Sequence, residues 1–223
     1  MTLLKRILYI GALISCLSAS VPLMAQDSPG HKEDLGGVAA FIIKKDWNEK
    51  WYSFIYCQYE QRDMFRNTEL YYARLVGRYK IRPWLHVGIS YDNMNYNLGG
   101  ESGYLRGHRS LLDILAIKRW GDFNFTWMER EYIYLHSKPR TSTPHFLFNF
   151  VRAEYVPDRS PVHPYVFGVL VNTYYSLNEI WAQAGMKVKI DDRNSLNIYY
   201  LHKSFLASDF GRSYLGLEYN LNL

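Results

Sequence analysis

The sequence predicts an all-β protein: a transmembrane, up-and-down antiparallel β-barrel of about 10–12 strands with short periplasmic turns. Alternating segments of about 12–14 residues recur along the chain, whereas strands of soluble proteins typically have about 5–6 residues. Aromatic residues make up 17% of the chain, and Tyr and Trp suit both strands and membrane–water boundaries. No window after the N-terminal segment is continuously apolar over the length of a membrane helix.

Residues 1–25 predict a cleaved signal peptide. Lys5 and Arg6 form its charged region, residues 7–17 its apolar region, and residues 23–25 (Leu-Met-Ala) an acceptable cleavage site. The apolar run is shorter than the roughly 20 residues of a spanning helix. We therefore expect export, and with the predicted barrel this places the mature protein in the outer membrane of a Gram-negative bacterium.

A lipidated N-terminus is the alternative, because residues 13–16 (Leu-Ile-Ser-Cys) resemble a bacterial lipobox ending at Cys16. The apolar stretch 17–24 argues against it, since a tethered lipoprotein usually turns polar at once. After cleavage only Cys57 remains, so no intrachain disulfide can stabilise the exported chain. A closed, hydrogen-bonded barrel supplies another source of stability.

Neither the net charge nor the predicted compartment favours nucleic acid as a partner. Removing Lys5 and Arg6 lowers the 26 basic residues to 24, against 21 acidic residues, so the mature net charge is +3. This balance is too mild to predict binding to a polyanion.

We expect the barrel to cover residues 37–223, preceded by a mature N-terminal segment, 26–36, that is not assigned to an element. Short connections alternate with longer or more polar ones, which is typical of periplasmic turns and outer loops. The predicted strands are 37–45, 50–62, 68–80, 84–96, 104–119, 122–135, 144–156, 163–175, 179–191, 194–205 and 212–223.

Each strand has one apolar face and one polar face, because side chains alternate sides with period two. In 179–191, for example, Ile180 and Val188 share one face, and Lys187 lies on the other. In a membrane barrel the apolar rows face lipid and the charged rows face the lumen. The candidate lumen-lining residues are Arg74, Arg78, Asp92, Arg109, Asp113, Arg152, Glu154, Lys187, Lys189 and Glu218. A soluble secreted barrel that binds an apolar ligand would reverse these faces, and it is retained as an alternative.

Two features do not fit a regular barrel. Glu129 and Glu131 share a face with Phe123, Phe125 and Trp127, so we expect a β-bulge near Trp127 to switch faces. Eleven segments also conflict with the even strand numbers of bacterial single-chain barrels. Either 37–45 is not a full strand, or 26–36 contributes another.

The mature chain resembles an uncharacterised outer-membrane barrel family, domain-of-unknown-function family 2490. The resemblance rests on residues 51–62 (WYSFIYCQYEQR), 164–166 (PYV), 177–179 (LNE) and the ending 214–221 (YLGLEYNL). It implies an outer-membrane barrel and brings no established activity.

The ending also resembles the C-terminal signal recognised by the barrel-assembly machinery, with Gly216, Tyr219 and Leu221 in place and Leu223 instead of the usual terminal Phe. The implied partners are this machinery, outer-membrane lipid and lipopolysaccharide. The oligomeric state is left open.

A lipid hydrolase is the enzymatic alternative. His108-Arg109-Ser110 places a His and a Ser two residues apart on one strand face, which resembles the His-x-Ser of the outer-membrane phospholipase. His202-Lys203-Ser204 repeats this spacing, and we can assign no Asn that would orient His108. A polar strand face is the simpler interpretation, so no catalytic residue is predicted.

Metal and cofactor binding are not predicted either, because His86, His145 and His163 fall at different heights of different strands. The inward charges either pair into a static polar core or line a narrow channel, since barrels of this size lie between filled and open ones. The sequence therefore predicts a non-enzymatic outer-membrane barrel that is structural or forms a narrow solute channel.

Overall fold

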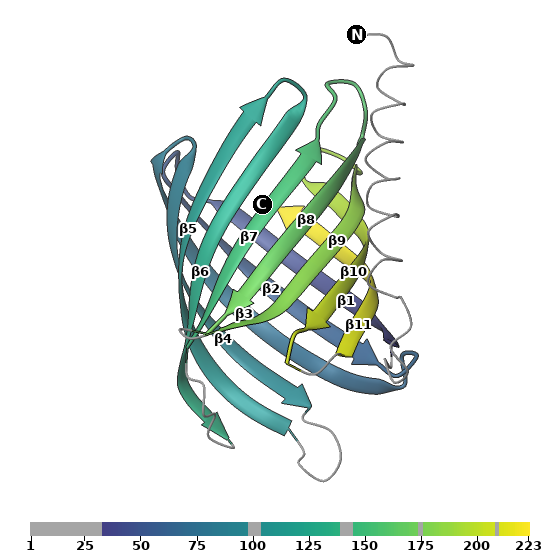
Figure 1. Ribbon diagram of the computed structural model, residues 1–223. Coiled ribbons are helices and arrows are strands. Elements are labelled where there is room, and N and C mark those ends of the chain that lie inside the picture. The colour runs from purple at the N-terminus through teal and green to yellow at the C-terminus, as the bar shows by residue number, and fades with distance from the viewer. Residues whose placement is uncertain (1–32, 98–103, 139–144, 174–175, 208–209) are drawn as a thin grey trace. The chain divides into compact units, whose positions relative to one another are not determined.

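The computed structural model describes residues 33–97, 104–138, 145–173, 176–207 and 210–223, which form one closed β-barrel (Figure 1). The signal peptide, Cys16 and part of the segment 26–36 lie outside these residues. The eleven strands are β1 (Glu33–Asp46), β2 (Trp51–Arg62), β3 (Asn67–Arg82), β4 (Leu85–Asn97), β5 (Tyr104–Trp120), β6 (Phe123–Lys138), β7 (His145–Tyr155), β8 (Val162–Asn172), β9 (Leu177–Lys189), β10 (Asn194–Phe205) and β11 (Phe210–Asn222). The predicted up-and-down barrel is confirmed.

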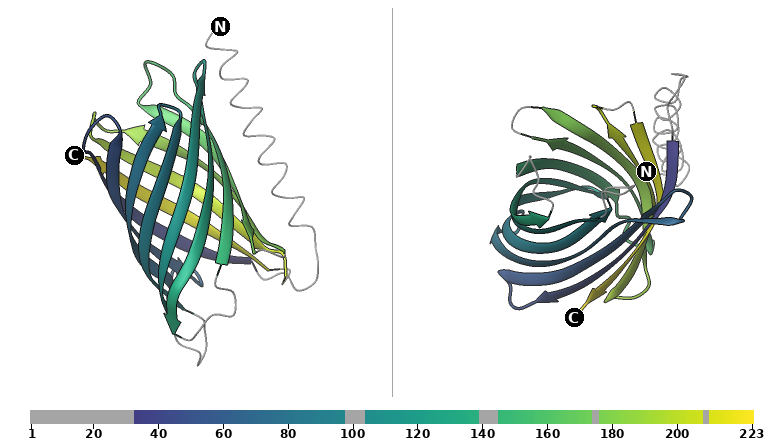
Figure 2. Two further views of the ribbon diagram at one scale, coloured as in Figure 1. Left: turned by 90° about the vertical axis from the view of Figure 1, so that its left-hand side faces the viewer. Right: turned by 90° about the horizontal axis from the view of Figure 1, so that it is seen from below.

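The barrel closes with an odd number of strands. Strands that alternate in direction leave β1 and β11 running the same way, so their pairing is parallel, from Glu33 opposite Gly211 to Lys44 opposite Asn222. Every other neighbouring pair is antiparallel and follows chain order (Figure 2). β1 is a full strand of 14 residues that begins before the predicted start at residue 37. The barrel thus keeps an odd strand number, and the parallel pair of β1 and β11 closes it.

The two faces of the wall differ in chemistry as the alternation predicts. Large apolar side chains in mid-strand are exposed, such as Leu75 (58%), Ile89 (60%) and Leu215 (54%). Charged side chains of the opposite parity are buried, such as Arg74 and Asp92. Several of these polar contacts join strands that are not neighbours in the sheet, which only the interior of a barrel permits. Apolar rows therefore face outward and charged rows face the lumen.

The outer wall carries an exception on β6. The register of β6 with β5 and β7 is continuous through Trp127, and its irregularity lies farther on, opposite His108 and Arg109. The bulge predicted near Trp127 is therefore wrong, and Glu129 and Glu131 stay on the outer face. Glu129 pairs across the sheet with Asn149 of β7, and Glu131 lies 3.6 Å from the His145 ring.

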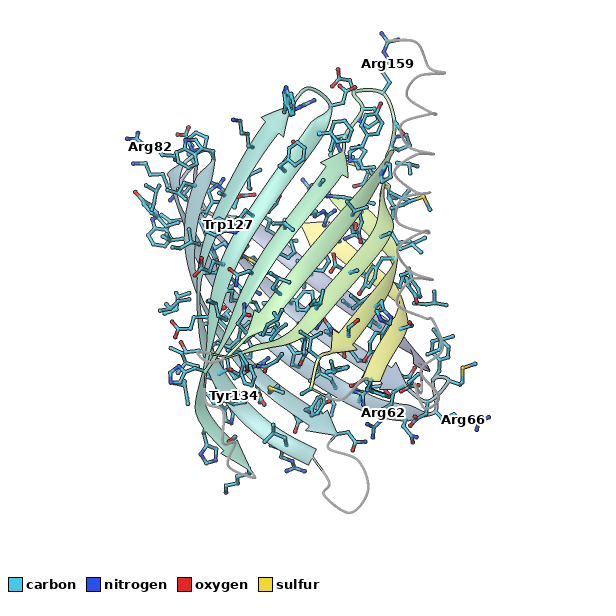
Figure 3. The ribbon with its side chains drawn as sticks, viewed as in Figure 1. Arg62, Arg66, Arg82, Trp127, Tyr134 and Arg159 are labelled. Atoms are coloured by element: carbon cyan, nitrogen blue, oxygen red, sulfur yellow. The ribbon has the colours of Figure 1, made fainter. Side chains whose placement is uncertain are left out.

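The ends of the barrel carry exposed aromatic and basic residues. Trp47, Trp51, Trp84 and Trp120 are more than half exposed around the turns 47–50, 83–84 and 121–122. Figure 3 shows Arg82 and Arg159 at this end and Arg62 and Arg66 at the opposite end. Tyr165, near the start of β8, is buried in the lumen, where its hydroxyl accepts a hydrogen bond from the Gln183 amide. It packs inward because its parity matches that of the buried His163.

The turn between β9 and β10 is built by one carboxylate. The Asp191 side chain accepts hydrogen bonds from the Asn194 amide and from the backbone N–H groups of Arg193 and Asn194. Hydrogen bonds from Asn194, followed by that from the Arg193 backbone, lower the pKa of Asp191. An Asp side chain that accepts hydrogen bonds from backbone N–H groups of its own turn is typical of tight connections.

Gly216 of the predicted assembly signal makes room for a tyrosine of the neighbouring strand β10. It lies beneath the Tyr199 ring of β10, and a Cβ atom added there would approach that ring to 2.0 Å. Tyr219 and Leu221 lie on the other face, where the Tyr219 ring stacks on Phe41 of β1 at 5.7 Å between centroids. After the strand ends, the Leu223 N–H donates to the Lys44 carbonyl at 2.8 Å.

We expect Gly216→Ala to lower the free energy of unfolding by about 1–3 kcal/mol, because the methyl group overpacks against Tyr199. Gly168→Ala is the matched control, since its Cβ would meet Val151 and the Trp181 carbonyl at ordinary distances of 3.7 and 3.8 Å. Urea unfolding of both refolded variants measures the difference. Equal effects at the two glycines would contradict the packing of Tyr199.

Candidate functional site

The lumen wall formed by β3, β4, β5 and β6 carries three rows of facing side chains. Strand register places Arg78, Gly88, Asp113 and Arg130 in one row and Arg74, Asp92, Arg109 and Tyr134 in another. Between them lies a row of Val76, Ser90, Leu111 and Tyr132. The rows on either side of this middle row contain four arginines (Arg74, Arg78, Arg109 and Arg130) and two aspartates (Asp92 and Asp113). We call these six residues the arginine cluster.

Asp92 forms ion pairs with two arginines. Arg74 donates from Nε and Nη2 to the two carboxylate oxygens at 2.7 and 2.8 Å, and Arg109 donates from Nη2 at 2.7 Å. Paired N–H groups that meet both oxygens of a carboxylate form the strongest protein ion pairs. Asp92 is fully buried, so these contacts replace its water shell.

Asp113 repeats this arrangement one row away. Arg78 donates to both of its oxygens at 3.0 Å, and Arg130 donates to Oδ2 at 3.0 Å. The Arg78 side chain must cross β4 to reach β5, and it does so at Gly88. A Cβ atom at Gly88 would lie 2.5 Å from Asp113 Oδ1 and 2.9 Å from Arg78 Cγ. The missing side chain therefore makes room for the ion pair.

Tyr132 connects the two groups. Its hydroxyl oxygen accepts from Arg74 at 3.2 Å and from Arg130 at 3.4 Å. The guanidinium of Arg109 lies over the same ring, 4.7 Å from its centroid. Three cations thus surround one aromatic side chain, whose ring face attracts positive charge.

The cluster has more positive than negative charge. Four guanidinium groups share two carboxylates, which leaves a net charge of 4 − 2 = +2. All six charged side chains are at most 12% exposed. Within the described chain, the Nε atoms of Arg109 and Arg130 and the Ser90 hydroxyl are buried without a hydrogen-bond partner. The cluster therefore has unused hydrogen-bonding capacity and uncompensated charge.

Other ion pairs cross the lumen elsewhere. Lys203 of β10 reaches Glu60 of β2 at 3.0 Å, and Arg212 of β11 binds Glu69 of β3. The Tyr214 hydroxyl donates to the second Glu69 oxygen at 2.6 Å. These contacts join strands that are three positions apart in the closed sheet, and they occupy the carboxylates that take part in them.

The predicted lumen residues divide into groups. Arg74, Arg78, Asp92, Arg109 and Asp113 belong to the arginine cluster. Arg152 and Glu154 form a separate pair at 2.8 Å, with the His163 ring 3.3 Å from Glu154. Lys187 and Glu218 both lie opposite Asn197, whose amide binds Glu218 at 2.5 Å, and Lys189 is exposed at a strand end.

Sequence reasoning missed Arg130, Glu60, Glu69, Lys203 and Arg212. Strict parity along β6 would have found Arg130, because it shares a face with Met128 and Tyr132. The other four are recognised through partners on strands distant in the sequence.

His108 and Ser110 lie on the outer wall. The Tyr91 hydroxyl is 2.6 Å from His108 Nδ1, and the His108 ring lies 6.4 Å from that of His136. The Tyr91 hydroxyl thus orients the His108 ring. The lipid hydrolase stays a hypothesis.

In the described residues, no group of three or more His, Cys, Asp or Glu side chains is arranged to hold a metal ion. The same residues contain no helix long and apolar enough to cross a membrane. Comparison with protein-family models, curated proteins and solved structures found no match.

We expect neutralisation of an aspartate in the arginine cluster to destabilise the protein more than neutralisation of an arginine. Asp113→Asn leaves Arg78 and Arg130 buried without a counter-charge, so it should cost about 3–5 kcal/mol of stability. Arg130→Met should cost less, because it reduces the excess charge while Arg78 still pairs with Asp113. Urea unfolding of both variants and of the double variant measures this asymmetry, and a larger cost for Arg130→Met would contradict it.

Proposed function

We propose that the protein is a non-enzymatic outer-membrane β-barrel with a narrow, positively biased lumen that passes small anions. The observation that carries the proposal is the segregation of the wall: exposed apolar rows outside and buried ionic rows inside. A soluble protein gains by burying apolar side chains, whereas a barrel in lipid gains by exposing them to hydrocarbon.

The proposal includes membership of an outer-membrane barrel family and a location in the outer membrane. The resemblance to domain-of-unknown-function family 2490 and the predicted signal peptide support export to the outer membrane. Gly216, Tyr219 and Leu221, arranged on opposite faces of the closing strand, support recognition of β11 by the barrel-assembly machinery.

The number of strands and the charge of the lumen support the proposal that small anions pass through it. Eleven strands lie between barrels of about eight strands, which side chains fill, and barrels of about 16–18, which leave a wide channel. Rings of Arg and Lys favour anions in pores. The net positive arginine cluster on one wall therefore favours anions, and the ion pairs that cross the lumen limit the size of any solute.

The membrane assignment predicts that Ile89→Arg is costly. A charge on the lipid face near the bilayer midplane costs about 2–4 kcal/mol. On a soluble surface, a substitution at such an exposed position stays within about 0.5 kcal/mol. Ala207→Arg, in the exposed loop after β10, is the control. Equilibrium folding into lipid vesicles measures both variants, and a neutral Ile89→Arg would favour a soluble barrel.

Single-channel recording in planar bilayers tests conduction. We expect small current steps with a reversal potential that indicates anion preference under a salt gradient. Arg109→Met should reduce this preference by removing a lumen cation, and Arg82→Met, at the exposed end of β3, should not. Absence of current from folded, inserted protein would contradict conduction and indicate a closed structural barrel.

A further inference from the structure

We propose that the arginine cluster is a binding site for a small oxyanion, such as phosphate or a carboxylate, which sits in the lumen above Ser90 between the two aspartates. The site rests on the lumen described above and deepens the proposed function. It does not depend on conduction, because a closed barrel has the same cluster.

The first argument is the charge balance. Two positive charges without counter-charges lie among side chains that are at most 12% exposed. Burying an unpaired charge is unfavourable, and proteins normally compensate it with an opposite charge. An anion of charge −1 or −2 would supply that compensation.

The second argument is that the protein's other lumen carboxylates are already engaged. Glu60 accepts from Lys203, and Glu69 accepts from Arg212 and Tyr214. Glu154 pairs with Arg152, Glu179 accepts from the Trp181 ring N–H, and Glu218 accepts from the Asn197 amide. Among the described side chains, Asp92 and Asp113 are the carboxylates that pair with the cluster, so a further counter-charge must come from solution.

The third argument concerns hydrogen bonds. Arg109 and Arg130 flank the row of Ser90 and Tyr132, and their Nε–H groups are buried without partners. The Ser90 hydroxyl, also without a partner, lies between the rows of Asp92 and Asp113. A ligand with several oxygen acceptors could satisfy donors from both arginines and from the serine.

These donors define the class of ligand. The planar fork of a guanidinium matches the paired oxygens of carboxylates and phosphates, which a spherical halide lacks. We therefore expect phosphate and acetate to bind more tightly than chloride. Comparison of the two oxyanions shows which shape the site prefers.

The test is thermal unfolding of the purified, folded barrel in detergent at pH 7.5 and constant ionic strength, with chloride replaced stepwise by phosphate or acetate. Ligand that binds only the folded state raises the unfolding midpoint in a saturable way. At a concentration 100-fold above Kd, the rise should be about 5–10 °C. A linear rise that never saturates, equal for all salts, would overturn the proposal.

Two variants make the test specific. Arg130→Met removes one ligand-binding cation and should abolish most of the saturable rise, while Arg82→Met, at the exposed rim, should retain it. Ser90→Asp places a resident carboxylate at the site, so it should raise the midpoint without phosphate and suppress the response to added phosphate. Ser90→Asn is its uncharged control and should do neither.

Electrophoretic mobility without heating identifies folded barrels before each measurement. If Ser90→Asp does not fold, Arg130→Met and Arg82→Met decide, and an equal phosphate response in these two variants overturns the site. A saturable response without channel current would support the site and contradict only the transport proposal. Current without a saturable response would support the transport proposal and contradict the binding site.

Discussion

Closure of the sheet is the constraint on which the rest of the structure depends. Once β1 pairs with β11, every strand has two neighbours, and each side chain must face either the outside or the lumen. The lumen is enclosed, so the charged side chains placed there pair with one another. This explains why Arg78 reaches past β4 to Asp113, and why Lys203 of β10 meets Glu60 of β2.

The same enclosure determines where glycine is needed. Gly88 leaves room for the ion pair of Arg78 with Asp113, and Gly216 leaves room for the Tyr199 ring. Gly77, by contrast, has open space where its Cβ would lie. Gly88 and Gly216, on the lumen face, therefore accommodate long side chains from the adjacent strands.

Much of the fold could be predicted from the sequence because period-two alternation is local. It is sufficient to place all eleven strands and to assign Arg74, Asp92 and Arg109 to one face. The partners could not be predicted, since Glu69 and Arg212 are separated by 143 residues and meet only through closure. Two acidic residues on the outer row of β6 made that strand look irregular, so Arg130, on its other face, was overlooked.

The lumen is electrostatically uneven, and this bears on what it can bind. Beside the charged wall of β3 to β6, strands β7 to β9 place aromatic side chains in the lumen. Phe150 packs on Phe167 at 4.4 Å between ring centroids, and Phe148 lies between Tyr132 and Trp181. Apolar walls hold little water and lower the local dielectric, which strengthens interactions with the arginines. A small anion would thus be attracted to one wall, and the aromatic wall would exclude larger hydrated solutes from the remaining space.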